Sequence, residues 1–144
     1  MSETVEIRGA GGQVRIEVLE YERPDATDTN ESNRLTCKCS VEVREFACNL
    51  NLSLRTHDFV QFRAQLNEAL EQLGGAVVVN TSEKRFRLEV TITRGGHADV
   101  FGYAQSNTAR PSTTMLAFSF ESDESFLAET NRELGKILQH FPVR

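Results

Sequence analysis

The stretch from Arg34 to Leu54, RLTCKCSVEVREFACNLNLSL, decides the fold because apolar and polar residues alternate along both of its halves. In a β-strand, successive side chains point to opposite faces of the sheet. The stretch therefore predicts two strands, each with one apolar face. These faces consist of Leu35, Cys37, Cys39, Val41 and Val43 on the first strand and Phe46, Cys48, Leu50, Leu52 and Leu54 on the second.

A two-residue turn at Arg44 and Glu45 would bring the two apolar faces together in one hairpin. Cys39 would then lie opposite Leu50. Arg-Glu is an uncommon pair for the turns that best fit a hairpin, so a longer loop with the same register is the alternative. In both cases the stretch predicts a pair of antiparallel strands.

The stretch also holds all three cysteines of the chain, Cys37, Cys39 and Cys48. In the predicted register Cys39 and Cys48 are diagonal neighbours, about 7 Å apart, which is too far for an unstrained disulfide. A zinc site needs about four converging ligands, and no pair of histidines accompanies these thiols. We therefore predict no metal site and three buried, unpaired thiols, because free cysteine packs as a small apolar residue.

The remaining chain continues this pattern on both sides of the hairpin. Alternation predicts strands around Val5, around Ile16, and over 76–79, 85–93, 100–106 and 113–122. Apolar residues at three- and four-residue steps predict two amphipathic helices, at 55–75 and 122–141. The fold class is thus α+β in a single domain, 1–144. We expect a mostly antiparallel sheet of about eight strands, with one central and one C-terminal helix packed on one side.

Composition and charge exclude several classes of protein. No apolar run is long enough to span a membrane, and the first residues lack the pattern of a signal peptide, so a cytoplasmic location is expected. The formal net charge of −5 disfavours a nucleic-acid partner, which needs clustered basic residues. It suits a basic protein partner, although solubility alone also explains it.

Candidate catalytic groups are scattered along the chain. The histidines are His57, His97 and His140, and none accompanies a recognisable nucleophile. Three acidic residues lie close to the predicted start of the last helix, where the helix dipole explains them without catalysis: Glu121, Asp123 and Glu124. We therefore predict neither enzymatic activity nor a cofactor. An enzyme with an unrecognised site is the least favoured alternative.

Residues 22–33, ERPDATDTNESN, form a polar and acidic loop before the cysteine hairpin. Its oxygen-bearing side chains lack the glycine and the terminal glutamate of a calcium-binding loop. Loops on a rigid scaffold often carry binding sites. We therefore predict Asp25, Asp28 and Glu31 as contacts for a protein partner, with a solvated loop of no function as the alternative.

Four segments, taken in order, resemble the WapI-like family of bacterial immunity proteins. One is the strand end VLEYERP, and another is ESNRLTCKCSVEV, where Glu31, Asn33 and Leu35 fit an Asp-x-Asn-Trp-Leu pattern and Arg34 stands in place of the tryptophan. The other two are the helix DFVQFRAQLNEAL and the ending FSFESDESFLAETNRELGKILQHFPVR.

The resemblance implies a small intracellular protein that binds and neutralises a cognate toxin domain, delivered by secretion or by contact. Such a protein needs no cofactor, no nucleic acid and no membrane, and negative charge suits a basic toxin. The rival hypothesis is a structural or regulatory interaction domain that has no toxin partner.

Overall fold

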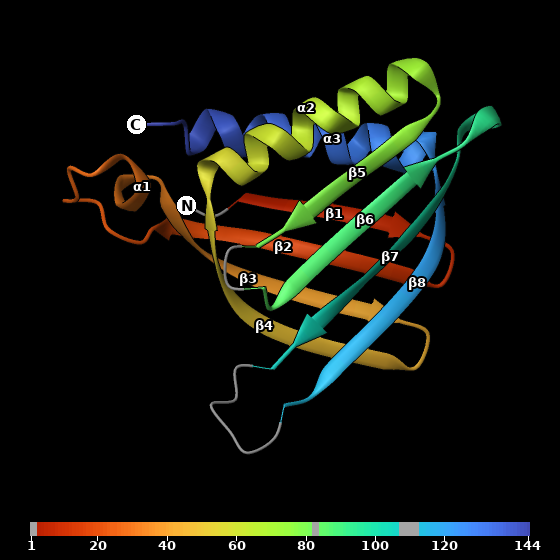
Figure 1. Ribbon diagram of the computed structural model, residues 1–144, viewed down its shortest axis with the longest axis horizontal. Helices are drawn as coiled ribbons and strands as arrows, with labels where there is room; N and C mark the ends of the chain where they lie inside the picture. Colours follow the sequence, from red (N-terminus) through yellow and green to blue (C-terminus); the bar gives the residue numbers. More distant parts are fainter. Residues whose placement is uncertain (1–2, 82–83, 107–112) are drawn as a thin grey trace.

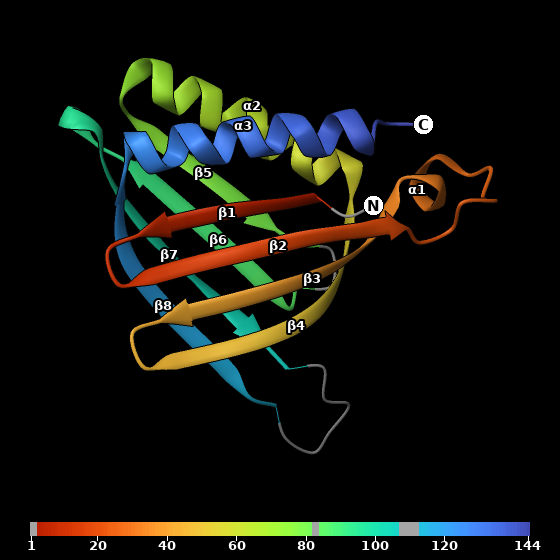
Figure 2. The same ribbon diagram turned by 180° about the vertical axis from the view of Figure 1, so that it is seen from behind.

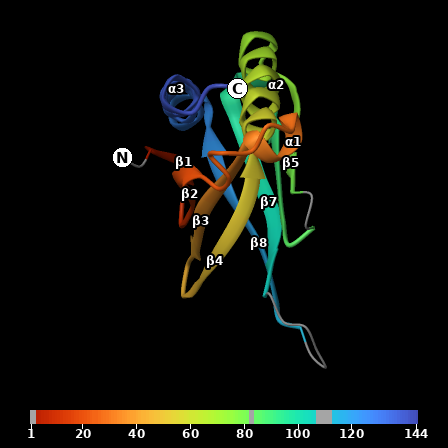
Figure 3. The ribbon, with the colours of Figure 1, turned by 90° about the vertical axis from the view of Figure 1, so that its left-hand side faces the viewer.

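The computed structural model describes residues 3–81, 84–106 and 113–144, and within them eight strands form two four-stranded antiparallel sheets. Sheet order follows chain order, β1-β2-β3-β4 and β5-β6-β7-β8, and the two sheets face each other in two layers (Figure 1, Figure 3). The bounds of the strands are β1 Glu3–Gly9, β2 Gly12–Tyr21, β3 Arg34–Val43, β4 Phe46–Arg55, β5 Gly75–Asn80, β6 Phe86–Ile92, β7 His97–Gln105 and β8 Met115–Asp123.

The α+β class, the eight strands and the two long helices are confirmed, but the strands divide into two sheets. Each strand has one apolar face, and two helices cannot cover eight such faces. Each sheet therefore covers the other, and their inner faces share one hydrophobic core. Largest among its fully buried side chains are Phe59, Phe62 and Phe86, two of them from a helix and one from β6.

Both long helices, α2 (Thr56–Gln72) and α3 (Glu124–His140), lie along the same edge of the two-layered molecule (Figure 1, Figure 2). There α3 covers β1, an outer strand of one sheet, and α2 covers β5, an outer strand of the other. On α3, Glu133 accepts a hydrogen bond from the N–H of Glu6 in β1 at 2.9 Å, and Thr130 donates one to the Glu6 carbonyl at 2.7 Å. On α2, Gln65 accepts from the β5 backbone. Two strand edges that could pair with another chain are thereby occupied. No helix in the described residues is long and apolar enough to cross a membrane.

The cysteine hairpin has the predicted register. Val43 pairs with Phe46, so Arg44 and Glu45 form the two-residue turn, and Cys39 pairs with Leu50. All three cysteines are free, but only Cys37 and Cys39 are buried. Cys48 is half-buried, because the apolar face of β4 becomes progressively exposed towards its Phe46 end, and the prediction of burial is wrong at this thiol.

The glycine-rich turn between β1 and β2 joins the two sheets. The N–H of Ala10 donates to the carbonyl of Glu121 in β8 at 2.8 Å. A Cβ atom at Gly9 would lie 1.9 Å from that same carbonyl oxygen, and one at Gly12 would lie 2.4 Å from the ring of Phe120. Only glycine permits so close an approach at these two positions.

Candidate functional site

The acidic loop, residues 22–33, contains a short helix, α1 (Thr29–Ser32), that the sequence does not predict. Asp28 stands at the N-cap of this helix. Its carboxylate accepts hydrogen bonds from the backbone N–H groups of Asn30 at 2.7 Å and Glu31 at 3.4 Å. Asp28 therefore stabilises the local backbone, because N-cap side chains satisfy N–H groups that a helix leaves without partners.

Glu31 lies between two arginines. Its carboxylate is 3.0 Å from Nε of Arg23, within the loop, and 3.5 Å from Nη2 of Arg34, at the start of β3. Arg34 also lies 3.9 Å from the carboxylate of Glu22. The residue that replaces the tryptophan of the family pattern thus places a cation beside the acidic loop, where it balances two of the loop's carboxylates.

The closing segment, residues 141–144, follows α3 and packs against the acidic loop (Figure 1). The guanidinium of Arg144 donates to the Ser32 carbonyl from Nε at 3.0 Å and from Nη2 at 2.5 Å. Its two other contacts, each at 3.4 Å, reach the carbonyls of Pro24 and Arg23. One side chain thereby contacts backbone carbonyls at both ends of the loop.

Asn33 and Tyr21 also contact the closing segment. The side chain of Asn33 accepts from the Arg144 N–H at 2.7 Å and donates to the Arg144 carbonyl at 3.3 Å. The Tyr21 hydroxyl donates to the Pro142 carbonyl at 2.5 Å, and its ring meets Phe141 edge to face. The Arg144 guanidinium lies 3.9 Å from the centre of the Tyr21 ring. Burial raises the pKa of Tyr21, and the positive charge of Arg144 opposes this shift.

The structure therefore places Asp25, Asp28 and Glu31 on one loop but in three different settings. Asp28 caps α1, Glu31 is paired with arginines, and Asp25 is exposed with no hydrogen bond or ion pair in the described part of the chain. Beside the loop is an open hollow of about 230 Å³. Its walls come from α1, the start of α2 and the closing segment: Thr29, Asn30, Asn33, Arg55, His57 and Val143.

The thiols offer no reactive group at neutral pH. Burial raises the pKa of Cys37 and of Cys39 to about 12, so both stay protonated and uncharged. The pKa of Cys48 is also raised, again chiefly by burial. Thiolates, not thiols, act as nucleophiles and metal ligands.

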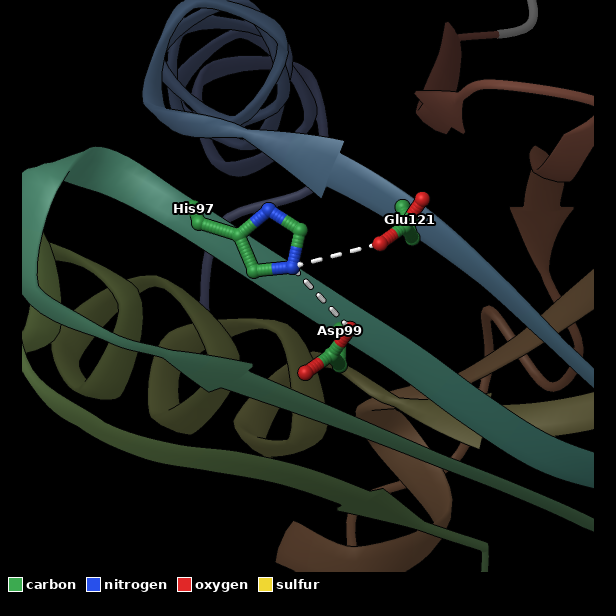
Figure 4. Close-up of side chains that lie close together, drawn as sticks. All are labelled: His97, Asp99 and Glu121. Atoms are coloured by element: carbon green, nitrogen blue, oxygen red, sulfur yellow. Dashed lines mark hydrogen bonds and ion pairs between the residues drawn. The ribbon is translucent and has the colours of Figure 1, made fainter.

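His97, Asp99 and Glu121 form the only group of at least three possible metal ligands found in the described residues (Figure 4). Nε2 of His97 lies 3.2 Å from Asp99, two residues along β7, and 3.5 Å from Glu121 on the neighbouring strand β8. Three such atoms could contact one divalent cation. All three side chains are exposed, however, and His97 already makes a hydrogen-bonding contact to Asp99. Sequence reasoning missed this group because Glu121 reaches it only through the pairing of β7 with β8.

The other residues considered for chemistry have structural contacts. Asp123 caps α3 by accepting from the Phe126 N–H at 3.0 Å. His140, in the last turn of α3, lies 3.0 Å from the carboxylate of Glu3. His57 and His97 lie on different elements from it, in α2 and β7, and the structure groups no two of the three histidines.

Comparisons with known proteins agree with the resemblance. A search of curated proteins found no match. The model of the immunity protein WapI-like family matches residues 6–142, which includes both long helices, the acidic loop and all strands except the first residues of β1. Because this match extends over nearly the whole sequence, the chain belongs to the immunity protein WapI-like family.

Proposed function

We propose that this protein acts in the cytoplasm as an immunity protein that binds a cognate toxin domain and neutralises it without catalysis. The observation that carries the proposal is the family match over residues 6–142. Family membership supports a toxin-neutralising role in general. The identity of the toxin and its contact with the acidic loop are the finer parts of the proposal.

The acidic loop is the proposed contact surface, with Asp25, Asp28 and Glu31 as its charged groups. Asp25 is the one that we expect to meet a cation of the partner directly, because its carboxylate is exposed and has no partner in the described residues. Asp28 and Glu31 hold the shape of the loop, and Asp28 adds to its negative potential, whereas Arg23 and Arg34 balance the charge of Glu31. A negative surface of this kind would speed association with a basic toxin.

The test is co-expression of this chain with the C-terminal domain of any large secreted protein that is encoded beside it. We expect the chain to restore growth to cells that express the toxin domain, and the two proteins to co-purify. Absence of both growth and co-purification would exclude this toxin as the partner.

A pair of variants tests the contact surface. Asp25→Asn removes one carboxylate from the acidic loop, whereas Glu68→Gln removes one from the exposed face of α2. We expect Asp25→Asn to slow association by about two- to tenfold at low salt, because an interface charge acts mainly on the encounter rate. Equal effects of the two variants would mean that overall charge, not the loop, governs binding.

A further inference from the structure

The acidic loop has almost nothing apolar to hold it in place. Its twelve residues, ERPDATDTNESN, include only Pro24 and Ala26 as apolar side chains, and neither is buried. Fixing the backbone of a residue costs about 1–2 kcal/mol of conformational entropy, which apolar burial normally offsets. In this loop the compensation must come from polar contacts.

Arg144 supplies more of these contacts than any other described residue outside the loop. Its guanidinium donates to the carbonyls of Ser32, Pro24 and Arg23, and its own N–H donates to the side chain of Asn33. Hydrogen bonds from charged donors are about twice as strong as neutral ones. Arg144 and its neighbour Val143 lie beyond the residues that the family model matches, 6–142.

Several carbonyls are contacted at once because the guanidinium is a rigid fork. Nε and Nη2 both reach Ser32, while Nη1 and Nη2 reach Pro24 and Arg23 at the opposite end of the loop. A lysine ammonium presents its donors from one point and cannot bridge the same carbonyls. The Tyr21 ring, 3.9 Å from the guanidinium, supports it from β2.

We infer that Arg144 is a positioning residue for partner binding: it fixes the acidic loop in one shape before the partner arrives. Its shortest hydrogen bonds go to Ser32 and Asn33, which are buried. Its two longer ones go to the carbonyls of Pro24 and Arg23, at exposed positions. The exposed side, with Asp25 and Thr27 to Asn30, stays free for contact. The inference has two parts: Arg144 orders the loop, and this order favours binding. The second part, its binding half, rests on the proposed function, because the partner is the proposed toxin domain.

Hydrogen exchange of the free protein tests the positioning directly. In Arg144→Gln, we expect amides of residues 22–33 to exchange about tenfold faster or more, because several charge-assisted hydrogen bonds are lost. The matched control is Arg132→Gln, which removes an exposed arginine on α3 that pairs with Glu129. Unchanged exchange of the acidic loop in Arg144→Gln would overturn the inference.

Arg144→Lys separates the fork from the charge. This variant keeps the positive charge near Tyr21 but loses the bridging geometry, so we expect loop exchange to be faster than in the wild type. The pKa of Tyr21, followed by ultraviolet titration in a Tyr103→Phe background, should rise in Arg144→Gln and stay near the wild-type value in Arg144→Lys. If the lysine variant restores both slow exchange and the pKa, the charge alone is sufficient and the fork has no special role.

Binding of the toxin domain tests the consequence. We expect Arg144→Gln to weaken affinity by about three- to tenfold, because ordering the loop must then occur during binding. Circular dichroism should show that the variant is still folded at the temperature of the binding measurement, so unfolding would not explain the loss. Faster loop exchange with unchanged affinity would overturn the positioning role. If the wild-type protein does not bind the toxin, the binding half fails together with the proposed function, while exchange still decides whether Arg144 orders the loop.

Discussion

The acidic loop and the β3–β4 hairpin adjoin in the sequence, yet different interactions hold them. The hairpin is held by local register and by burial of side chains such as Leu35 and Cys39. The loop is held by hydrogen bonds and ion pairs, many of them to Arg144, more than 100 positions away. Apolar burial makes the stability of the hairpin insensitive to salt and to mild changes in charge. The hydrogen bonds and ion pairs of the loop can instead be weakened by changing a single donor or acceptor.

The largest effect is expected in the hairpin. Leu35→Ala should lower the free energy of unfolding by about 2–5 kcal/mol, because Leu35 is fully buried and truncation leaves a cavity. The control is Lys38→Ala, on the exposed face of the same strand, which should change it by less than about 0.5 kcal/mol. Urea unfolding measures both, and similar values would contradict the importance of burial for this hairpin.

A smaller effect is expected at the polar attachment of the loop. Asn33→Ala should cost about 1–3 kcal/mol of stability. The buried side chain of Asn33 forms hydrogen bonds with Arg144 and with the Thr29 carbonyl, and both of these groups would lose a partner. Asn30→Ala, at an exposed position in α1, is the matched control. A loss at Asn33 no greater than that at Asn30 would show that the loop is held in another way.

The hairpin should also respond to alkaline pH. With folded pKa values of about 12, Cys37 and Cys39 stay protonated while the thiols of the unfolded chain ionise near pH 9. Their contribution is complete below about pH 9 and falls as pH rises towards about 12, by about 1.4 kcal/mol per thiol at pH 10. Denaturation between pH 8 and 10 should therefore show a shallower decline in Cys37→Ala/Cys39→Ala. Equal slopes in the variant and the wild type would contradict the shifted pKa values.

The smallest effects separate two carboxylates of the loop. Asp28→Ala should cost about 1 kcal/mol, because it removes an N-cap. Asp25→Ala should change stability by less than about 0.5 kcal/mol, since its side chain has no partner in the described residues. Thermal unfolding compares the two. If Asp25→Ala is the more destabilising, Asp25 is a structural residue and not a free contact group.

The same contrast explains what the sequence could predict. Alternation gives strand faces and, with one short turn, the register from Leu35 to Leu54, because these depend on neighbours in the chain. The division into two sheets depends on which apolar faces meet, and alternation carries no information on that. Alternation could not predict the exposure of Cys48 for the same reason, because this exposure depends on how far the second sheet covers β4.

The site was predictable only in part. The acidic loop stands out by composition, but the roles of Asp28 and Glu31 depend on a four-residue helix and on Arg34. Arg144 carries no local signal, because its partners lie 111 positions or more away. His97 and Glu121 likewise meet only across paired strands. Polar contacts between distant segments are set by the finished fold, and a periodic pattern does not encode them.

The attachment of α3 to β1 has a consequence for how the chain assembles during synthesis. The first strand leaves the ribosome long before α3, and until Thr130 and Glu133 reach Glu6, this edge of β1 lacks those partners. An unpaired edge can capture a strand of another chain, so a nascent or truncated protein would be prone to aggregate. Light scattering of a chain ending before Glu124 would test this. Once α3 has been made and packed, it protects β1.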